Sequence, residues 1–512
     1  MSTAGFPFDH LVVVHYHWRP GGVRRVVELT LPAIAKAAGA DLKKISFLHG
    51  GEAIERPNLE QITTPLAFIH EPACDYFSHQ SETPERLSRK IHEAVAHLMP
   101  RGDCTKTLIW FQNPALARNA MLCRELIRFS RHTGAALVLH HHDFWCAGRW
   151  SRWNELRECG CPDLASAAEF LFASGTRCVQ VGINWQDFET LQRFFAKQAF
   201  HLPNPVGRFP QPDKAGHTTI RDWVADQLKS DAPLWLYPTR FLRRKNLLEA
   251  ILLTRWLNPE AILATTSGQF SRDEACYARE IKQAAAYHGW RVHFGLLDPA
   301  EAPRISELLP VAETVVHTSV QEGFGMTFVE TAASGTPLIA RAIPSVMPDL
   351  AAQGFEFPQV YDDILIDQHL FDKTAERRRQ TALAESTRLE LPEVFRKLFP
   401  NRSDEFNGPV SFSRLTRQAQ MEVLAHPAEE SWSLCKPLNP KLKHFLDNEL
   451  RATPWPDETV QTPSRFAEQF LQIASAIPSE PVNSSRGAEH AQLALAQLAL
   501  GPEAVFPIQL ER

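Results

Sequence analysis

The feature that most constrains the fold is a repeated alternation of short apolar, β-branched runs with longer helical patterns. Such an alternation is typical of parallel α/β structure, because each helix returns the chain to the start of the next strand. It predicts a first set of strands at residues 11–17, 45–50, 66–71, 107–113, 137–141 and 178–184. Helices are expected between them, for example at Gly22–Ala38, Pro84–Leu98 and Leu116–His132.

The alternation is interrupted once and then starts again. Two prolines in LPNPV (202–206) predict a hinge or linker. A second set of strands is predicted at residues 233–240, 261–266, 291–297, 313–319 and 337–341. A chain of 512 residues exceeds what one hydrophobic core usually holds. We therefore expect two doubly wound, Rossmann-like units, residues 1–204 and 205–360, that face each other across a cleft and bind ligands at the carboxyl ends of their strands.

The remaining segment, residues 361–512, has a different character. Prolines interrupt it, and helical patterns remain in islands, notably Ser411–Leu424, Ser464–Ile477 and Gly487–Leu500. We predict a mainly helical C-terminal extension. Part of it, near Ser464–Ile477, is expected to pack back on the N-terminal unit.

Charge and composition exclude several classes of function. Fifty-nine acidic residues against 54 basic ones give a net charge of −5, which does not favour nucleic acid as a partner. Nine cysteines in an odd, scattered set favour reduced thiols, and with them a cytoplasmic location. No signal peptide is expected, nor any apolar run near the ~18 residues of a transmembrane helix. Peripheral contact with a membrane stays open.

The most informative stretch is TVVHTSVQEGFGMTFVETAASGTP, residues 314–337. It predicts a helix from Met326 to Ser334, with Gly335 as its left-handed cap. Glycines in the turn 321–325 let the backbone approach a ligand closely. Together with the free N–H groups of a helix start, they predict a site that favours phosphate.

Two carboxylates belong to this loop and helix. Glu322 lies in the turn, and Glu330 lies one turn into a helix whose other residues are small or apolar. Carboxylates accept hydrogen bonds from paired hydroxyls such as those of a sugar. A glutamate near a helix start is also favoured by the helix dipole alone. The apolar surroundings favour a binding role, because buried carboxylates need partners.

The run EGFGMTFVE resembles the acidic motif of glycosyltransferase family 4, a retaining family with the two-domain GT-B fold. The resemblance covers approximately residues 10–350. It implies transfer of a hexose from a nucleotide-diphosphate sugar to a hydroxyl acceptor. It also implies that Glu330 binds the ribose hydroxyls, and that the donor sugar is addressed by Glu322 and by the backbone of Gly323, Phe324 and Gly325.

Cations for the leaving diphosphate are expected at a strand-to-helix turn, PTRFLRRKN. Arginine offers a fork for phosphate oxygens and lysine a point charge, and the family pattern falls on Arg240 and Lys245. Arg243 and Arg244 are interpreted as surface residues. The family usually has glycine after the lysine, whereas this chain has Asn246.

A glycine pair follows the first predicted strand. Gly21-Gly22 resembles the family's N-terminal pair, whose amides approach the diphosphate and the sugar, although many such pairs are simple turns. The sequence contains no Asp-x-Asp pair, so neither a metal nor another cofactor is expected. It also contains neither a G-x-G-x-x-G nor a G-x-x-x-x-G-K pattern, which disfavours dinucleotide and P-loop sites.

On the acceptor side, the strand LVLHH runs into His142 and Asp143. A neutral histidine can position a hydroxyl or share its proton, and a neighbouring aspartate can orient it. Simple packing of these histidines is the alternative. The family's His-Asp pair falls on His142 and Asp143, with His141 as second choice. Further acceptor-side candidates are Asn113, Asn119 and Arg149. The thiols Cys146, Cys159 and Cys161 have no usual zinc spacing and are interpreted as packing residues.

Other functions remain open on the same fold. A phosphorylase would need a Schiff-base lysine, which no signature identifies. A nucleotide-sugar epimerase would turn over the donor without an acceptor. A non-catalytic nucleotide-sugar-binding scaffold is expected to lose at least one donor-side element, and none is missing. The donor base, the sugar and the acceptor depend on loops without a transferable signature.

Overall fold

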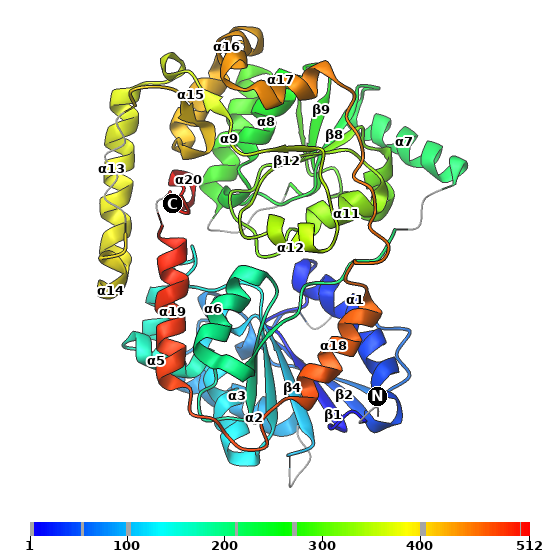
Figure 1. Cartoon of the computed structure of the whole chain (residues 1–512), viewed down its shortest axis with the longest axis vertical. Coiled ribbons are helices and arrows are strands. Elements are labelled where there is room, and N and C mark those ends of the chain that lie inside the picture. The colour runs from blue at the N-terminus through cyan, green and yellow to red at the C-terminus, as the bar shows by residue number, and fades with distance from the viewer. Residues whose placement is uncertain are drawn as a thin grey trace. The chain divides into compact units, whose positions relative to one another are not determined.

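The computed structural model describes residues 5–52, 56–98, 104–209, 213–268, 274–399, 406–501 and 503–511. The chain divides into two compact units, each built from several stretches of sequence (Figure 1). Unit 1 comprises Met1–Val206, Leu389–Pro400 and Gln461–Ala504. Unit 2 comprises Gly207–Arg388, Asn401–Val460 and Val505–Arg512.

Unit 1 is built on a seven-stranded parallel sheet with the order β3-β2-β1-β4-β5-β6-β7. Its strands are β1 (His10–Val14), β2 (Lys44–His49), β3 (Leu66–His70), β4 (Thr107–Gln112), β5 (Ala136–His141), β6 (Cys178–Gly182) and β7 (Ala199–His201). The central strands β1, β4 and β5 are buried along their whole length, as expected when helices cover both faces of a parallel sheet. All six strands predicted for this unit are present, and the short β7 was not predicted.

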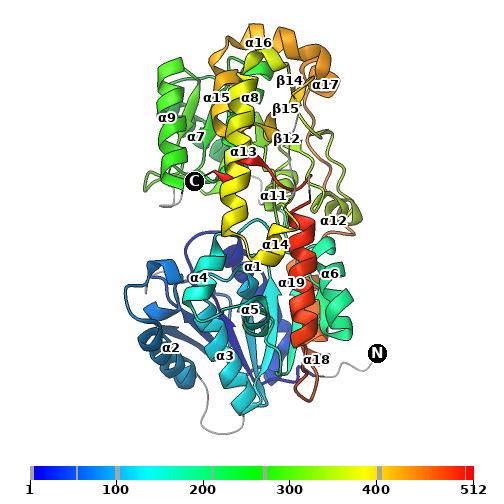
Figure 2. The same cartoon turned by 90° about the vertical axis from the view of Figure 1, so that its left-hand side faces the viewer.

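Helices from both ends of the chain cover this sheet. They are α1 (Gly22–Ala38), α2 (Pro84–Leu98), α3 (Ala120–Thr133), α4 (Arg152–Glu158), α5 (Leu164–Leu171), α6 (Trp185–Phe195), α14 (Glu393–Arg396), α18 (Pro463–Ser475) and α19 (Ser485–Ala499). Helix α18 packs along α1 (Figure 1). Its Phe470 ring lies 4.9 Å from the ring of Trp110 on β4. Helix α19 packs on α5 and α6 (Figure 2), where Gln492 accepts a 2.9 Å hydrogen bond from Trp145 Nε1.

Unit 2 is built on a six-stranded parallel sheet with the order β10-β9-β8-β11-β12-β13. Its strands are β8 (Leu234–Tyr237), β9 (Ile262–Thr265), β10 (Val292–Phe294), β11 (Thr314–His317), β12 (Leu338–Arg341) and β13 (Gln359–Tyr361), with a separate antiparallel pair, β14 (Leu365–Ile366) and β15 (Val410–Ser411). The five predicted strands are present. Strand β13 was not predicted and lies where the sequence alternation ends.

The helices of unit 2 are α7 (Lys214–Leu228), α8 (Leu247–Leu257), α9 (Ala275–His288), α10 (Ile305–Leu308), α11 (Met326–Ser334), α12 (Met347–Ala352), α13 (Lys373–Glu390, within this unit up to Arg388), α15 (Arg417–Ala425), α16 (Ala428–Cys435), α17 (Pro440–Asp447) and α20 (Pro507–Leu510). Helix α8 is buried nearly throughout and carries one charged group inside the core, Glu249. Arg341 donates two hydrogen bonds of 2.7 Å to that carboxylate, and the Tyr361 hydroxyl donates another of 2.7 Å. The charge is therefore compensated where it is buried.

The two sheets share one topology, with the first strand of each between its second and its fourth. The prediction of two doubly wound, Rossmann-like units, the domain content of the GT-B fold, is confirmed. In such sheets the order reverses beside the first strand, and ligands bind at the carboxyl ends of the strands there. The loops after β1 and β4, and those after β8 and β11, are thus the places to examine. Within the described residues, no helix is both long enough and apolar enough to span a bilayer.

Candidate functional site

In unit 2, the loop after β8 carries the predicted cations. A single 3₁₀ turn, Arg243–Lys245, leads to Asn246, which adopts a left-handed conformation with φ +54° before α8 begins. Asparagine tolerates this conformation better than most residues, so it can stand where the family pattern has glycine. The Thr318 hydroxyl, in the loop after β11, donates to the carbonyls of Lys245 at 3.0 Å and Asn246 at 2.9 Å. The two loops are thereby held together.

The loop after β11 leads into α11 as predicted. The helix begins at Met326 and ends at Ser334, and Gly335 is its left-handed cap with φ +71°. Gly325 precedes the helix with φ +85°, and a Cβ atom there would lie 2.7 Å from Val346 Cγ1. Both its conformation and its surroundings therefore require glycine. This fixes the turn from which the first amides of α11 emerge.

A compact charge cluster joins these two loops. The Glu322 carboxylate, whose side chain is 10% exposed, accepts hydrogen bonds from Lys245 Nζ and, at 3.0 Å, from Arg244 Nη1. His317 Nε2 lies 3.7 Å from Glu322 Oε1. Burial alone would raise the pKa of Glu322, but the charges of Lys245 and Arg244 outweigh it and hold the pKa below its usual range. The carboxylate is therefore ionised at neutral pH.

Within the described residues, the cluster contains more basic groups than acidic ones. Burial lowers the pKa of His317 to about 3, so this histidine is neutral and adds no charge. Lys245 and Arg244 contribute two cations against the one anion of Glu322. Two positioned donors and a helix start lie within two adjoining loops, an arrangement that can hold an anion.

Arg244 is a member of the cluster that the sequence interpretation missed. It was assigned to the surface together with Arg243, but it bonds both Glu322 and, at 2.9 Å, the carbonyl of Gln321. Arg243 faces elsewhere and pairs with Glu274 at 3.1 Å. The signal in the sequence was the run of basic residues itself, which does not tell which of them turns toward the neighbouring loop.

The other donor-side candidates lie in the loops after β8 and β11 and on α11. Arg240 is exposed, and within the described residues its guanidinium makes no hydrogen bond or ion pair. Glu330 is half-buried on the second turn of α11. Phe324 is buried, with 3% of its surface exposed. Gly323 is half-buried beside it.

In unit 1, the glycine pair follows β1 as predicted. Gly21 is the N-cap of α1, Gly22 is the first residue of the helix, and both are exposed. A Cβ atom on Gly22 would meet no atom within 4 Å. The first turn of α1 contains no acidic residue to occupy its free amides. The amides at this helix start are thus open to an anion.

His142 lies at the carboxyl end of β5, and its partner is Gln112 at the end of β4. The distance from His142 Nε2 to Gln112 Oε1 is 2.9 Å. An amide oxygen only accepts, so Nε2 carries the proton and Nδ1 keeps its lone pair. Burial lowers the pKa of His142 well below its usual value, with further lowering by His140 and His15. The ring is neutral, with one nitrogen able to accept a hydrogen bond.

The remaining acceptor-side candidates divide into two groups. Asn113 accepts from the backbone N–H of His142 at 3.3 Å and of Asp143 at 2.9 Å, and so shapes the loop after β5. Asp143 was expected to orient His142, but the structure pairs it with Arg149 at 3.2 Å, and Gln112 takes the orienting role.

The second group lies within the fold. His141 points into the core, where its Nε2 lies 2.9 Å from Gln180 Oε1. Asn119 caps α3, and its amide nitrogen donates to the carbonyls of Ala73 and Asp75 at 2.8 Å. Cys146, Cys159 and Cys161 are buried free thiols. Among the described residues, no three His, Cys, Asp or Glu side chains form a group that could hold a metal ion.

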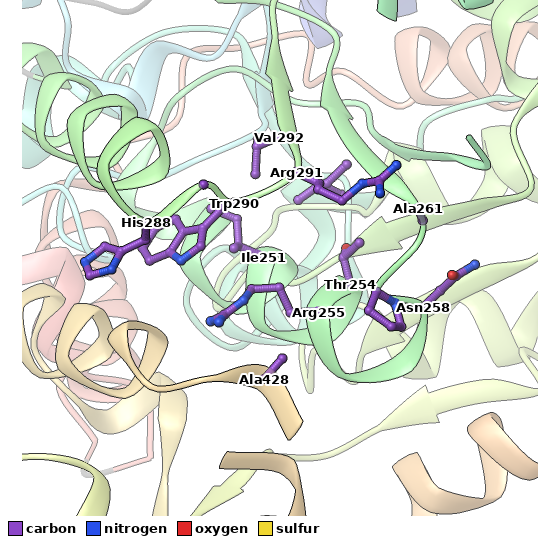
Figure 3. Close-up of a pocket in the computed structure, with 13 residues that line it drawn as sticks. Ile251, Thr254, Arg255, Asn258, Ala261, His288, Trp290, Arg291, Val292 and Ala428 are labelled. Carbon is purple, nitrogen blue, oxygen red and sulfur yellow. The ribbon is translucent and has the colours of Figure 1, made fainter. Parts of the chain in front are cut away.

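A cavity of about 190 Å³ lies in unit 2 on a different edge of the sheet (Figure 3). Ala261 and Arg291 line it and precede β9 and β10, so it lies at the amino ends of these strands. The donor-side loops follow carboxyl ends. Arg255, beside Trp290 in Figure 3, is already engaged with the carbonyls of Leu424 and His426. The cavity is therefore separate from the charge cluster.

Comparison with known proteins shows that the charge cluster lies within a region that matches a known protein family. Residues 220–391 match the family glycosyl transferases group 1, a range that contains Lys245, Glu322 and Glu330. A curated relative, the mannosylglucosyl-3-phosphoglycerate synthase of Petrotoga mobilis, is 25% identical over 340 residues. The match covers 63% of this chain, and the chain spans 63% of the length of that relative.

Solved structures are also similar to this chain. The UDP-glucose complex of HepE from Anabaena has a TM-score of 0.49 and 14% identity, and the match covers 86% of this chain and 99% of that one. The sucrose-phosphate synthase of Thermosynechococcus elongatus has a TM-score of 0.45 and 19% identity, covering 65% and 82%.

Proposed function

We propose that this chain, whose residues 220–391 belong to the glycosyl transferases group 1 family, is a retaining, metal-independent glycosyltransferase. It transfers a hexose from a nucleotide-diphosphate sugar to a hydroxyl acceptor. The observation that carries the proposal is the cluster of Lys245, Arg244 and Glu322 at the point where the strand order of unit 2 reverses. We place the enzyme in the cytoplasm, in keeping with its nine free cysteines.

On the donor side, the diphosphate gains negative charge as the glycosidic bond breaks, and fixed cations lower the free energy of that state. Lys245 and Arg244 supply them, and the exposed Arg240 can add a third. Glu322 holds the two cations in place before the donor arrives, so little reorganisation is needed. Because the chain provides this charge itself, the reaction needs no divalent ion.

Hydroxyl groups of the donor are assigned to the carboxylates. Glu322 is ionised and accepts hydrogen bonds from the sugar, while Glu330 accepts them from the ribose. The backbone of Gly323, Phe324 and Gly325 and the amides at Gly21 and Gly22 complete the donor contacts. Every one of these assignments is part of the proposal.

On the acceptor side, His142 Nδ1 accepts a hydrogen bond from the attacking hydroxyl. Its low pKa keeps the ring neutral at physiological pH, and Gln112 fixes the tautomer that leaves Nδ1 free for this task. The hydroxyl attacks the face from which the diphosphate departs, which retains the configuration. The glutamates then serve as binders rather than as the flanking acid pair of a glycosidase.

The test is turnover of UDP-, ADP- and GDP-sugars with an acceptor panel in the presence of EDTA. Lys245→Met should lower kcat by about 10²–10³-fold, the usual effect of removing one donor to a developing anion. Lys245→Arg should retain part of the rate, and Lys229→Met, at a lysine that is 78% exposed in the same unit, should be unaffected. An unchanged kcat in Lys245→Met, or loss of turnover in EDTA, would refute the proposal.

The same assay separates the alternatives. Turnover of the donor without any acceptor would identify an epimerase. Binding of a nucleotide sugar without any turnover across the panel would identify a scaffold. A pyridoxal absorption band would identify a cofactor-dependent phosphorylase.

A further inference from the structure

Three loops of unit 1 converge on Tyr76, in the segment that follows β3. Arg118 stacks on the ring of Tyr76 at 4.5 Å from its centroid, and Arg19 lies 6.0 Å from the same centroid. The Tyr76 hydroxyl lies 2.9 Å from His17 Nε2. Asp75 Oδ2 pairs with Arg19 Nη2 at 2.5 Å. We call Arg19, Asp75, Tyr76 and Arg118 the Tyr76 cluster.

The backbone holds this cluster firmly. A Cβ atom at Gly50, after β2, would lie 1.9 Å from the amide nitrogen of Asp75, so the two segments touch. The Phe77 amide donates to the carbonyl of Arg118 at 2.7 Å. The side-chain amide of Asn119 donates to the carbonyl of Asp75 at 2.8 Å. The arginine and the tyrosine are thus positioned by hydrogen bonds between their own loops.

Arg118 carries a charge that no carboxylate in the described part of the chain neutralises. Within the described residues its guanidinium has no carboxylate partner, and its buried Nε has no hydrogen-bond partner. Asp75 Oδ2 pairs with Arg19 Nη2 at 2.5 Å and lies 3.3 Å from His79 Nδ1, so this carboxylate is engaged by groups other than Arg118. The neighbouring His15 cannot add or remove charge at neutral pH, because burial lowers its pKa to about 4. One positive charge therefore remains, on a side chain that stacking has already ordered.

The cluster lies next to the acceptor-side residues. Arg118 belongs to the loop after β4, which begins at Asn113, directly after Gln112. Tyr16 connects the start of this loop with the Tyr76 cluster. Its hydroxyl donates to the Asn113 carbonyl at 3.3 Å, and its ring centroid lies 5.7 Å from that of Tyr76. The side-chain nitrogen of Gln112, fully buried beside His142, also lacks a partner among the described residues.

We infer that the Tyr76 cluster binds an anionic group of the acceptor, a phosphomonoester, through the fork of Arg118. That the bound molecule is the sugar acceptor rests on the proposed function. That it carries an anionic group rests on the geometry of unit 1. A guanidinium offers parallel N–H groups that match two phosphate oxygens, and an ordered one loses less entropy on binding. The acceptor hydroxyl is then presented to His142 by a molecule anchored at its charged end.

The experiment measures binding of glycerol 3-phosphate to the full chain by isothermal titration calorimetry. Arg118→Gln should weaken binding by about ten- to a hundredfold, as expected for charged hydrogen bonds. Arg118→Lys, which keeps the charge, should lie between. Arg86→Gln, at an arginine that is 68% exposed in the same unit, is the matched control and should bind normally. Thermal unfolding of each variant verifies that it is folded.

A donor-side variant separates this subsite from the diphosphate site. Lys245→Met should bind glycerol 3-phosphate as the wild type does and should lose affinity for UDP. Arg118→Gln should lose affinity for glycerol 3-phosphate and should bind UDP as the wild type does. Vesicles containing phosphatidic acid present the same phosphomonoester on a lipid. Arg118-dependent binding of either probe supports the subsite, and the probe that binds shows whether the phosphomonoester belongs to a soluble molecule or to a lipid. Equal binding by wild type and Arg118→Gln, or binding lost only in Lys245→Met, would overturn the inference.

The two proposals fail in different ways. If glycerol 3-phosphate binds in a way that depends on Arg118 but no sugar is transferred, the anion subsite is supported and the transferase function is refuted. If the protein transfers sugar and Arg118→Gln changes neither kcat nor the KM for the acceptor, the transferase function is supported and the anion subsite is refuted.

Discussion

Acidification should weaken unit 1 through a histidine that plays no part in the proposed chemistry, His141. This side chain is fully buried on β5 and bonds Gln180 through one nitrogen. Burial lowers its pKa from 6.5 to about 4. Because the folded pKa lies below the unfolded one, protons bind preferentially to the unfolded chain. The stability present above the unfolded pKa is therefore lost as the pH falls through 6.5 toward 4.

The magnitude follows from these two values. Between about pH 7 and about pH 5, the unfolded histidine becomes almost fully protonated while the folded one stays mostly neutral, a difference of about 2 kcal/mol. His141→Gln removes the titrating group and retains a side chain that can bond Gln180. The variant should lose less stability than the wild type over this interval, by the same ~2 kcal/mol. Other buried histidines titrate in both proteins and cancel in the comparison.

Hydrogen exchange of the β5 amides, residues 136–141, is the suitable assay, because the two units need not unfold together. The opening free energy of β5 is measured at both pH values, with intrinsic exchange corrected by unfolded reference peptides. His132→Gln, at an exposed histidine on α3 of the same unit, is the control and should retain the wild-type pH dependence. If His141→Gln has the wild-type dependence too, burial of His141 does not determine its charge and the reasoning is refuted.

Two further predictions concern unit 2 and use thermal unfolding. Gly325→Ala should destabilise by about 2 kcal/mol or more, since φ is +85° and the new Cβ would press on Val346. Gly289→Ala, with φ +64° and open space around it, should lose less, and equal losses would contradict the steric argument. Arg341→Met should cost about 3–5 kcal/mol because it leaves the buried Glu249 carboxyl without its cationic partner, and adding Glu249→Leu should restore part of that loss. No recovery in the double variant would contradict this reading of the pair.

The sheets and the main helix of the donor loop could be predicted because their signals are local. Buried parallel strands are continuous apolar runs, and the limits of α11 follow from glycines at each end. Strands β7 and β13 have three residues each, too few for such a run to stand out. Helix α13 is long but strongly polar, so it lacks the apolar stripe on which a helix prediction depends.

The residues that escaped prediction are defined by neighbours distant in sequence. Nothing near Gln112 indicates that it will meet His142, thirty positions later, at the edge of the sheet. Arg118 lies in a loop already singled out for the acceptor side, yet its unpaired charge appears only when the segment around Tyr76 is in place. Arg244 and Arg243 are adjacent and chemically identical, and only the fold separates them.

The packing of α18 on α1 has a consequence for biosynthesis. The Trp110 ring on β4 and the apolar face of α1 are completed by Phe466 and Phe470, which are translated more than 350 residues after Trp110. Between the synthesis of β7 and that of α18, the first sheet is therefore present with part of its interior uncovered. Unit 1 reaches its final form only after α18 has left the ribosome, and a nascent chain stalled before α18 is a natural client for chaperones.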